Sequence, residues 1–208
     1  MQARGRMLDL ERHVRNRLEA ELPKTLTYHG AHHTISDVLP SVDRICRGEG
    51  VSDAQTDLVR AAALFHDLGF VESYYGNEPI GARLATQSLP QFGFSVEEID
   101  RIAGLILSTE IREIDGAWVQ APGDDLLKRI LCDADLDNLG RDDFFEVSDS
   151  LRRELEFQGE RFTDREWCTR QIAFVSRQEW FTATQRRDRD ATKRGNLERL
   201  RQELSELS

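Results

Sequence analysis

The chain has 208 residues, of which 39% are hydrophobic and 32% charged, and its formal net charge is −10. This length suits one domain, or one domain with a short extension. Prolines are few and apolar residues rarely alternate with polar ones, which disfavours a β-sandwich or barrel. A nucleic-acid surface needs clustered lysine and arginine, so the acidic balance argues against nucleic acid as the main partner.

The cysteines and the hydropathy pattern indicate in which cellular compartment the protein is expected. Cys46, Cys132 and Cys168 are scattered and lack C-x-x-C spacing, so they indicate neither a disulfide framework nor a zinc knuckle. No apolar run approaches the roughly 20 residues needed to cross a bilayer. The N-terminus lacks the apolar core of a signal peptide. We therefore expect a cytoplasmic protein with reduced cysteines and no membrane partner.

Apolar residues at helical spacing predict helices almost throughout. A first amphipathic helix covers 4–22 and ends at Pro23. A second covers 31–47, with a kink expected at Pro40 because the apolar stripe continues on both sides of it. Further helices are expected over 79–89, 124–138, 142–158 and the charged tail from 185, with an exposed loop over 109–123.

Capping signals mark three more helix starts. The pairs with capping-box spacing are Ser52 with Gln55, Ser95 with Glu98, and Thr163 with Glu166. The apolar face of the first of these helices ends at Leu68, so Gly69 is expected at the C′ position.

These elements predict an all-α fold, a single-domain helical bundle with essentially no strand. The N-terminal helix within 1–25 is expected to pack on a main domain over 26–185, followed by a charged helix over 186–208. The apolar stripe of that last helix suits either the chain's own core or a second subunit. A homo-oligomer is therefore possible.

Three of the five histidines fall within seven residues: His29, His32 and His33. A fourth, His66, precedes Asp67 at the end of an apolar helix. Imidazole nitrogens and carboxylate oxygens suit Mn, Fe, Co, Ni or Zn, and carboxylate-rich sites also accept Mg. These residues predict a site for one divalent metal ion with positions open to water and substrate. Hydrogen-bonded core or capping histidines are the alternative.

A later acidic cluster supplies a further candidate ligand. Asp133, Asp135 and Asp137 lie at the C-terminal end of the helix expected over 124–138. Carboxylates at a helix C-terminus interact unfavourably with the helix dipole. The cluster therefore favours a functional role, such as metal binding, over a solvated helix end. Helical periodicity does not choose among the three aspartates.

The order His33, His66-Asp67, Asp135 resembles the H…HD…D signature of the HD superfamily of metal-dependent phosphohydrolases. The likeness extends from about residue 26 to 185, and the segments 64–69 and 132–140 strengthen it. It implies that His33, His66, Asp67 and Asp135 hold one metal. In the family the ligand of the acidic run is the aspartate that follows alanine, which here is Asp135. It also implies that a metal-activated water hydrolyses a small phosphorylated substrate, such as a nucleotide.

The segment from Tyr28 to His33 is similar to the Y-H-N-x-x-H opening of cyclic-nucleotide phosphodiesterases. That similarity makes His33 the ligand and His29 the candidate donor of a proton to the leaving oxygen. His32 is expected to point elsewhere.

The departures from the family pattern also carry information. No histidine follows His66, which disfavours the second metal of dinuclear members, including the di-iron oxygenases. Phe70 stands where nucleotidase-type members carry a glutamate. Related proteins often have His-Glu at Asn77-Glu78, so Glu78 is a candidate general base, with a surface glutamate as the alternative.

Lys128 and Arg83 are the candidate ligands for substrate phosphate, and solvated surface cations are the alternative. Because subgroup-specific catalytic groups are missing, a non-catalytic HD module that binds metal or nucleotide for regulation is the second functional hypothesis.

Overall fold

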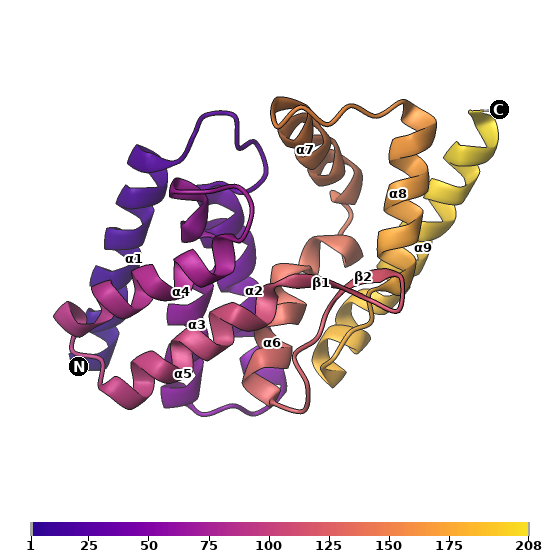
Figure 1. Cartoon of the computed structure of the whole chain (residues 1–208). Helices are drawn as coiled ribbons and strands as arrows, with labels where there is room; N and C mark the ends of the chain where they lie inside the picture. Colours follow the sequence, from indigo (N-terminus) through magenta and orange to yellow (C-terminus); the bar gives the residue numbers. More distant parts are fainter. Residues whose placement is uncertain (1, 208) are drawn as a thin grey trace.

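The computed structural model describes residues 2–207 and is almost entirely helical (Figure 1). Its α-helices are α1 Gln2–Glu21, α2 Leu39–Gly48, α3 Asp53–Phe65, α4 Asn77–Ser88, α5 Val96–Ile106, α6 Leu126–Asp135, α7 Phe144–Phe157, α8 Asp164–Arg177 and α9 Ala183–Glu206. The shorter helical turns are η1 His33–Val38, η2 Leu68–Val71, η3 Leu89–Phe92, η4 Leu107–Thr109 and η5 Asp137–Gly140. The predicted helical bundle is confirmed.

The main hydrophobic core lies among α1 to α6. The side chains that the periodicity of the first helix predicted as buried are buried: Met7, Leu10, Val14 and Leu18. Ala61, Ala62 and Phe65 of α3 are also fully buried, because α3 lies inside the bundle and contacts α1, α2, α4, α5 and α6. The end of α3 is therefore surrounded by protein.

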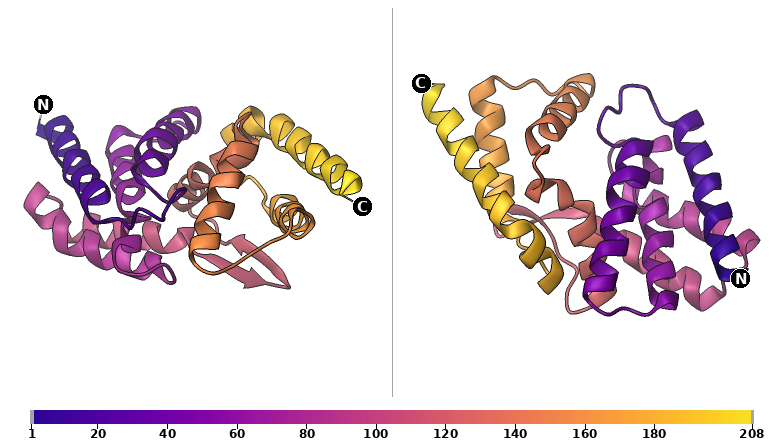
Figure 2. Two further views of the ribbon diagram at one scale, coloured as in Figure 1. Left: turned by 90° about the horizontal axis from the view of Figure 1, so that it is seen from above. Right: turned by 180° about the vertical axis from the view of Figure 1, so that it is seen from behind.

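A second, smaller apolar cluster joins η5, α7, α8 and α9. It comprises Leu136, Leu139, Phe144, Cys168, Val175, Trp180 and Leu200. Leu197 and Leu204 of α9 pack against it, so the stripe of the last helix covers the chain's own core. Figure 2 shows α8 and α9 side by side.

The expected helix over 31–47 is irregular in its first part. Residues His33–Val38 form a π-helix, η1, and regular α-helix begins at Leu39. Pro40 lies at the start of α2, where the helix tolerates a residue without an N–H. The irregularity therefore precedes the proline. π-helical turns are rare and occur often at functional sites.

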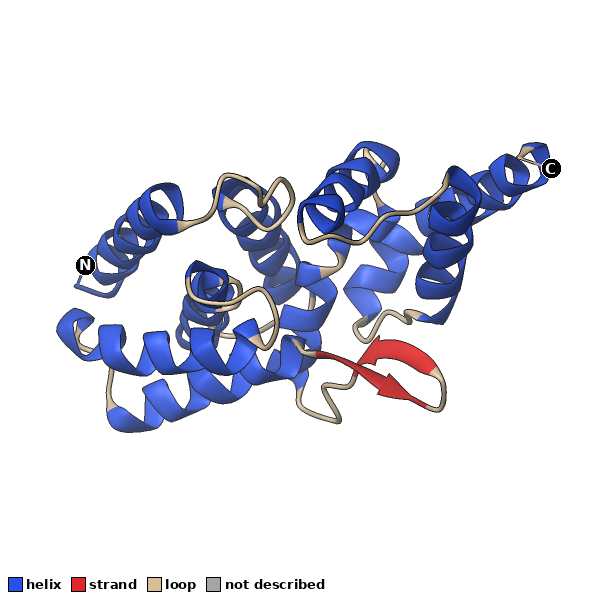
Figure 3. Ribbon diagram, turned by 45° about the horizontal axis from the view of Figure 1, so that its top comes forward, coloured by secondary structure: helices blue, strands red, loops and turns tan. Residues whose placement is uncertain are grey.

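Residues 109–123, expected as a loop, contain an antiparallel hairpin of β1 Ile111–Ile114 and β2 Ala117–Gln120 (Figure 3). Ile111 pairs with Gln120 and Ile114 with Ala117. Asp115 and Gly116 form the two-residue turn with φ of 51° and 75°. Asp-Gly is a strong hairpin signal because this turn type needs positive φ at both positions. The prediction of a loop over these residues was therefore wrong.

Gly69 does not have the predicted C′ role. α3 ends at Phe65, and Gly69 lies within η2 without a positive φ. A Cβ there would lie 1.9 Å from the carbonyl oxygen of Asn77, so glycine allows η2 to approach the start of α4. That approach places Asn77 and Glu78 beside the end of α3.

The three predicted helix starts are confirmed. Ser95–Glu98 and Thr163–Glu166 are reciprocal capping boxes, whereas the Ser52 hydroxyl accepts a bond from the Gln55 N–H and donates one to Gln55 Oε1. Among residues 2–207, no helix combines the length and apolar character of a membrane span.

Candidate metal centre

Three helical elements deliver the four predicted ligands to one place. His33 is the first residue of η1, His66 and Asp67 follow α3, and Asp135 is the last residue of α6. Ligand atoms of His33, His66 and Asp135 all lie within 4.8 Å of one another. The three elements are far apart in sequence, so the main core is what brings them together.

The distances match those around one small cation. Asp135 Oδ1 lies 3.3 Å from His33 Nε2 and 3.2 Å from His66 Nε2. Asp67 Oδ2 lies 3.5 Å from His33 Nε2 and 3.1 Å from His66 Nε2. Ligand atoms that bond one ion at about 2.0–2.2 Å are separated by roughly 3–3.5 Å. His33, His66 and Asp135 are therefore close enough together to hold a single ion, and Asp67 lies beside the two histidines.

Unsatisfied buried atoms support the same conclusion. His66 Nδ1 lies 2.7 Å from the carbonyl oxygen of Ala63, which can only accept, so Nδ1 donates and the neutral imidazole has its lone pair on Nε2. His66 Nε2 and Asp67 Oδ2 are both buried without a hydrogen-bond partner. Leaving such atoms unpaired is costly, and a cation between them would satisfy both. The donor set fits a divalent metal.

The electrostatics are those of a concentrated negative site. Burial raises the pKa of Asp135, but the adjacent imidazoles of His33 and His66 outweigh burial and lower that pKa. Burial lowers the pKa of His66, but the carboxylates of Asp67 and Asp135 outweigh burial and hold the His66 pKa well above its usual value. The carboxylates therefore favour a positive charge at this point, as a bound cation would supply.

His29 is held by a glutamate that the sequence interpretation missed. The Glu154 side chain is fully buried, and its Oε1 forms a short hydrogen bond with His29 Nδ1. Glu154 Oε2 accepts the backbone N–H groups of Tyr28 and His29, at 2.8 and 3.0 Å. The Tyr74 hydroxyl donates to Oε1 at 3.2 Å. Glu154 therefore fixes both the backbone and the ring of His29.

This pair shifts the acidity of the imidazole. Burial lowers the pKa of His29, but the hydrogen bond that His29 donates to Glu154 and the charges of Asp67, Glu154 and Asp135 raise it overall. The Phe70 ring stacks on His29 with centroids 4.3 Å apart. Phe70 thus packs on the candidate acid.

Glu78 lies near the ligands at the start of α4 and is partly buried. Burial raises its pKa, and the nearby charges of Asp67, Glu110 and Asp135 raise it further. In one orientation the Asn77 amide donates to Asp67 Oδ1 at 3.4 Å. Turned over, it donates to Glu78 at 2.9 and 3.2 Å, and these shorter distances favour the second orientation. Glu78 is therefore a neighbour of the centre rather than a remote surface residue.

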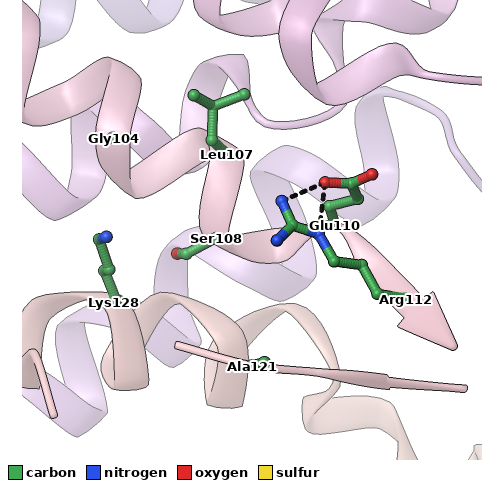
Figure 4. Close-up of a pocket in the computed structure, with 7 residues that line it drawn as sticks. All are labelled: Gly104, Leu107, Ser108, Glu110, Arg112, Ala121 and Lys128. Carbon is green, nitrogen blue, oxygen red and sulfur yellow. Dashed lines mark hydrogen bonds and ion pairs between the residues drawn. The ribbon is translucent and has the colours of Figure 1, made fainter. Parts of the chain in front are cut away.

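The other predicted residues lie away from the ligands. Arg83 is exposed and pairs with Glu72 at 2.5 Å. Lys128 lies seven residues before Asp135 on α6, or about 10 Å along the helix, and lines a cavity of about 210 Å³ (Figure 4). The His32 side chain is 81% exposed and points away, as predicted.

The three aspartates of the acidic run have three different environments. Asp133 accepts hydrogen bonds from the backbone N–H groups of Phe181 and Thr182, and burial raises its pKa to about 6. Asp137 binds Arg44 and Arg189. Only Asp135 faces the histidines.

Two residues near the centre, Glu154 and Gln120, were not predicted from the sequence, and a sequence pattern indicated only the first of them. Glu154 follows Val147 and Leu151 at helical spacing, so a carboxylate on the apolar stripe of α7 was visible in the sequence. Gln120 donates a 2.7 Å hydrogen bond to Asp135 Oδ2, and no sequence pattern indicated this contact.

No family model and no curated protein matches this sequence. Among solved structures, the chain is similar to the crystal structure of a predicted HD superfamily hydrolase from an uncultured Thermotogales bacterium. The TM-score is 0.62 at 17% identity, covering 95% of this chain and 92% of the other. The protein therefore has the fold of an HD superfamily hydrolase, with a His33, His66 and Asp135 cluster that can hold a metal ion.

Proposed function

We propose that this protein is a metal-dependent phosphohydrolase that acts on a nucleotide or another small phosphate ester or anhydride. The observation that carries the proposal is the convergence of His33, His66, Asp67 and Asp135, with buried donor atoms of His66 and Asp67 left unpaired. A divalent ion held there supplies Lewis acidity and lowers the pKa of a coordinated water.

Hydrolysis forms a bond from water oxygen to phosphorus and breaks the bond from phosphorus to the leaving oxygen, which then needs a proton. His29 is the proposed donor. Glu154 engages Nδ1, so the protonated imidazole has its Nε2–H free to donate. The buried carboxylate also stabilises the charged ring and fixes its orientation, as a carboxylate does for a catalytic histidine elsewhere.

Glu78 is the proposed acceptor of the proton lost by water. Its pKa is raised by burial first and then by Asp67, Glu110 and Asp135, which makes its carboxylate a stronger base than a free glutamate. Its position at the start of α4, beside Asn77 and the end of α3, supports this role.

Lys128 is the proposed contact for a part of the substrate distant from the bond that breaks. Its distance from Asp135 along α6 exceeds the size of one phosphate group. No described carboxylate forms an ion pair with its ammonium, whereas the neighbouring Arg112 is paired with Glu110 at 2.5 Å. Arg83, paired with Glu72, is the weaker candidate.

The test is turnover of a panel of nucleotides and simple phosphate esters with Mn²⁺, Mg²⁺ or Co²⁺. Asp67→Ala is expected to abolish turnover, whereas the exposed His32→Ala is expected to retain it. Unchanged turnover in Asp67→Ala would overturn the proposal. Tight nucleotide binding without turnover under each metal would instead support a regulatory HD module, the role that Phe70 in place of a glutamate favours.

A further inference from the structure

Gln120 connects the β1–β2 hairpin to the candidate metal centre. It is the last residue of β2, and only 3% of its surface is exposed. Its Nε2 donates to Asp135 Oδ2 at 2.7 Å and to the Thr109 carbonyl oxygen at 2.8 Å. Both partners are acceptors, so the orientation of the amide is determined. Its Oε1 has no partner among the described residues, so these two bonds are what hold the side chain.

The bond from Gln120 gives the two carboxylate oxygens of Asp135 different partners. Its Oδ1 faces both imidazoles, at 3.3 and 3.2 Å, while Oδ2 is occupied by Gln120. Groups that bind the second atom of a ligand orient it and tune its affinity for metal. We propose that Gln120 is a positioning residue that presents Asp135 to the metal through one oxygen. The inference rests on the metal centre of the proposed function.

The proposal makes the hairpin part of the centre. All four residues of β1 are exposed, and Figure 3 shows the two strands extending beyond the helices. A two-stranded hairpin is marginal by itself, so its conformation depends on its attachments. One is Gln120. Another is Gln178, a buried residue after α8, whose Nε2 donates to the Trp118 carbonyl oxygen at 2.6 Å.

These two glutamines allow a matched comparison. Gln120→Met and Gln178→Met each remove one side-chain donor that holds the hairpin, with little change in volume. Only Gln120 touches a ligand. Gln120→Glu is the third variant, because it replaces the N–H donor by an oxygen that faces the Asp135 carboxylate. Circular dichroism establishes that each variant is folded.

The measurement is binding of Mn²⁺ and Co²⁺ alone, by equilibrium dialysis, together with the visible spectrum of the Co²⁺ form. Gln120→Met is expected to weaken binding about 10- to 100-fold, the usual cost of losing such a contact. Its Co²⁺ spectrum should change as the coordination of Asp135 changes. Gln120→Glu should weaken binding at least as much, and Gln178→Met should match the unaltered protein in both readouts.

Two results would overturn the proposal. Unchanged affinity and spectrum in Gln120→Met would remove the positioning role. Equal losses in Gln120→Met and Gln178→Met would assign the effect to the hairpin as a whole. If the unaltered protein binds metal without hydrolysing any phosphate compound, the hydrolase proposal fails, and the metal affinities of the variants still decide the role of Gln120. If it binds neither metal, both proposals fail.

Discussion

His29 and Glu154 lie 125 residues apart in the chain and share a short hydrogen bond between an imidazole nitrogen and a fully buried carboxylate. Glu154 also accepts hydrogen bonds from the backbone N–H groups of Tyr28 and His29. The last third of the chain therefore determines the geometry and the acidity of a residue near its beginning.

Substitution of Glu154 should move the pH dependence of hydrolysis. Burial lowers the His29 pKa and Glu154 raises it, so Glu154→Gln should lower that pKa. The acid form of His29 is lost as pH rises through its pKa, and the decline of kcat/KM should begin at lower pH in the variant. At pH 8 we expect a loss of about 100-fold, the low end for general acid catalysis.

Tyr74→Phe is the control for this experiment. It removes one hydrogen bond to Glu154 and leaves the carboxylate and its bond to His29 in place. Its pH profile should stay close to that of the unaltered protein. A shift of the same size in both variants would contradict the assignment of the effect to the Glu154 charge.

Metal binding should release protons and weaken at low pH. Burial lowers the His66 pKa, but the neighbouring carboxylates hold it well above its usual value. A protonated imidazole must lose its proton to bind an ion, so affinity should fall as pH decreases. Calorimetry of Mn²⁺ binding in buffers of different ionisation enthalpy measures the protons released. Binding without proton release would show that His66 is not a ligand.

Gly69→Ala should destabilise the fold. The added Cβ would lie 1.9 Å from the Asn77 carbonyl oxygen, so the backbone of η2 or α4 must shift. We expect a loss of about 3 kcal/mol in the free energy of unfolding, as for severe overpacking. Denaturant titration checks this. The control is Gly195→Ala in α9, where a Cβ meets nothing within 4 Å and a gain of about 0.5 kcal/mol is expected.

Asp137 should contribute stability that depends on pH. Burial raises its pKa, but Arg189, Gln185 and Arg44 outweigh burial and lower it. A carboxyl group whose pKa is lower in the folded state stabilises the fold above its unfolded pKa, near 4, and this contribution disappears as pH falls through the folded pKa.

Asp137→Asn should therefore cost about 3 kcal/mol at pH 7, because it leaves two arginines without their buried partner. Denaturant titration at pH 7 and at pH 3 measures the change in the free energy of unfolding between these pH values. This change should be smaller in Asp137→Asn than in the unaltered protein. Asp188→Asn, which removes an outer partner of Arg44, should cost less than about 1 kcal/mol. Equal losses in the two variants would contradict the role assigned to burial.

The sequence by itself determined the helices and the types of ligand, because both are local properties. Apolar spacing and capping residues describe interactions within a few turns, and they located the buried face of α1 and the starts of α3, α5 and α8. His66 and Asp67 were recognisable because polar groups at the end of a buried helix are costly without a partner. The Asp115-Gly116 turn was also a local signal, and it was overlooked.

The tertiary structure alone decided which polar groups share an environment. Helical periodicity does not distinguish Asp133, Asp135 and Asp137, and the choice of Asp135 came from a resemblance. Packing is what turns Asp135 toward the histidines and Asp137 toward arginines. Glu154 and Gln120 acquire their roles from contacts with His29 and Asp135. Such contacts depend on how helices and a hairpin pack against one another, because hydrogen bonds act over about 3 Å in space irrespective of separation along the chain.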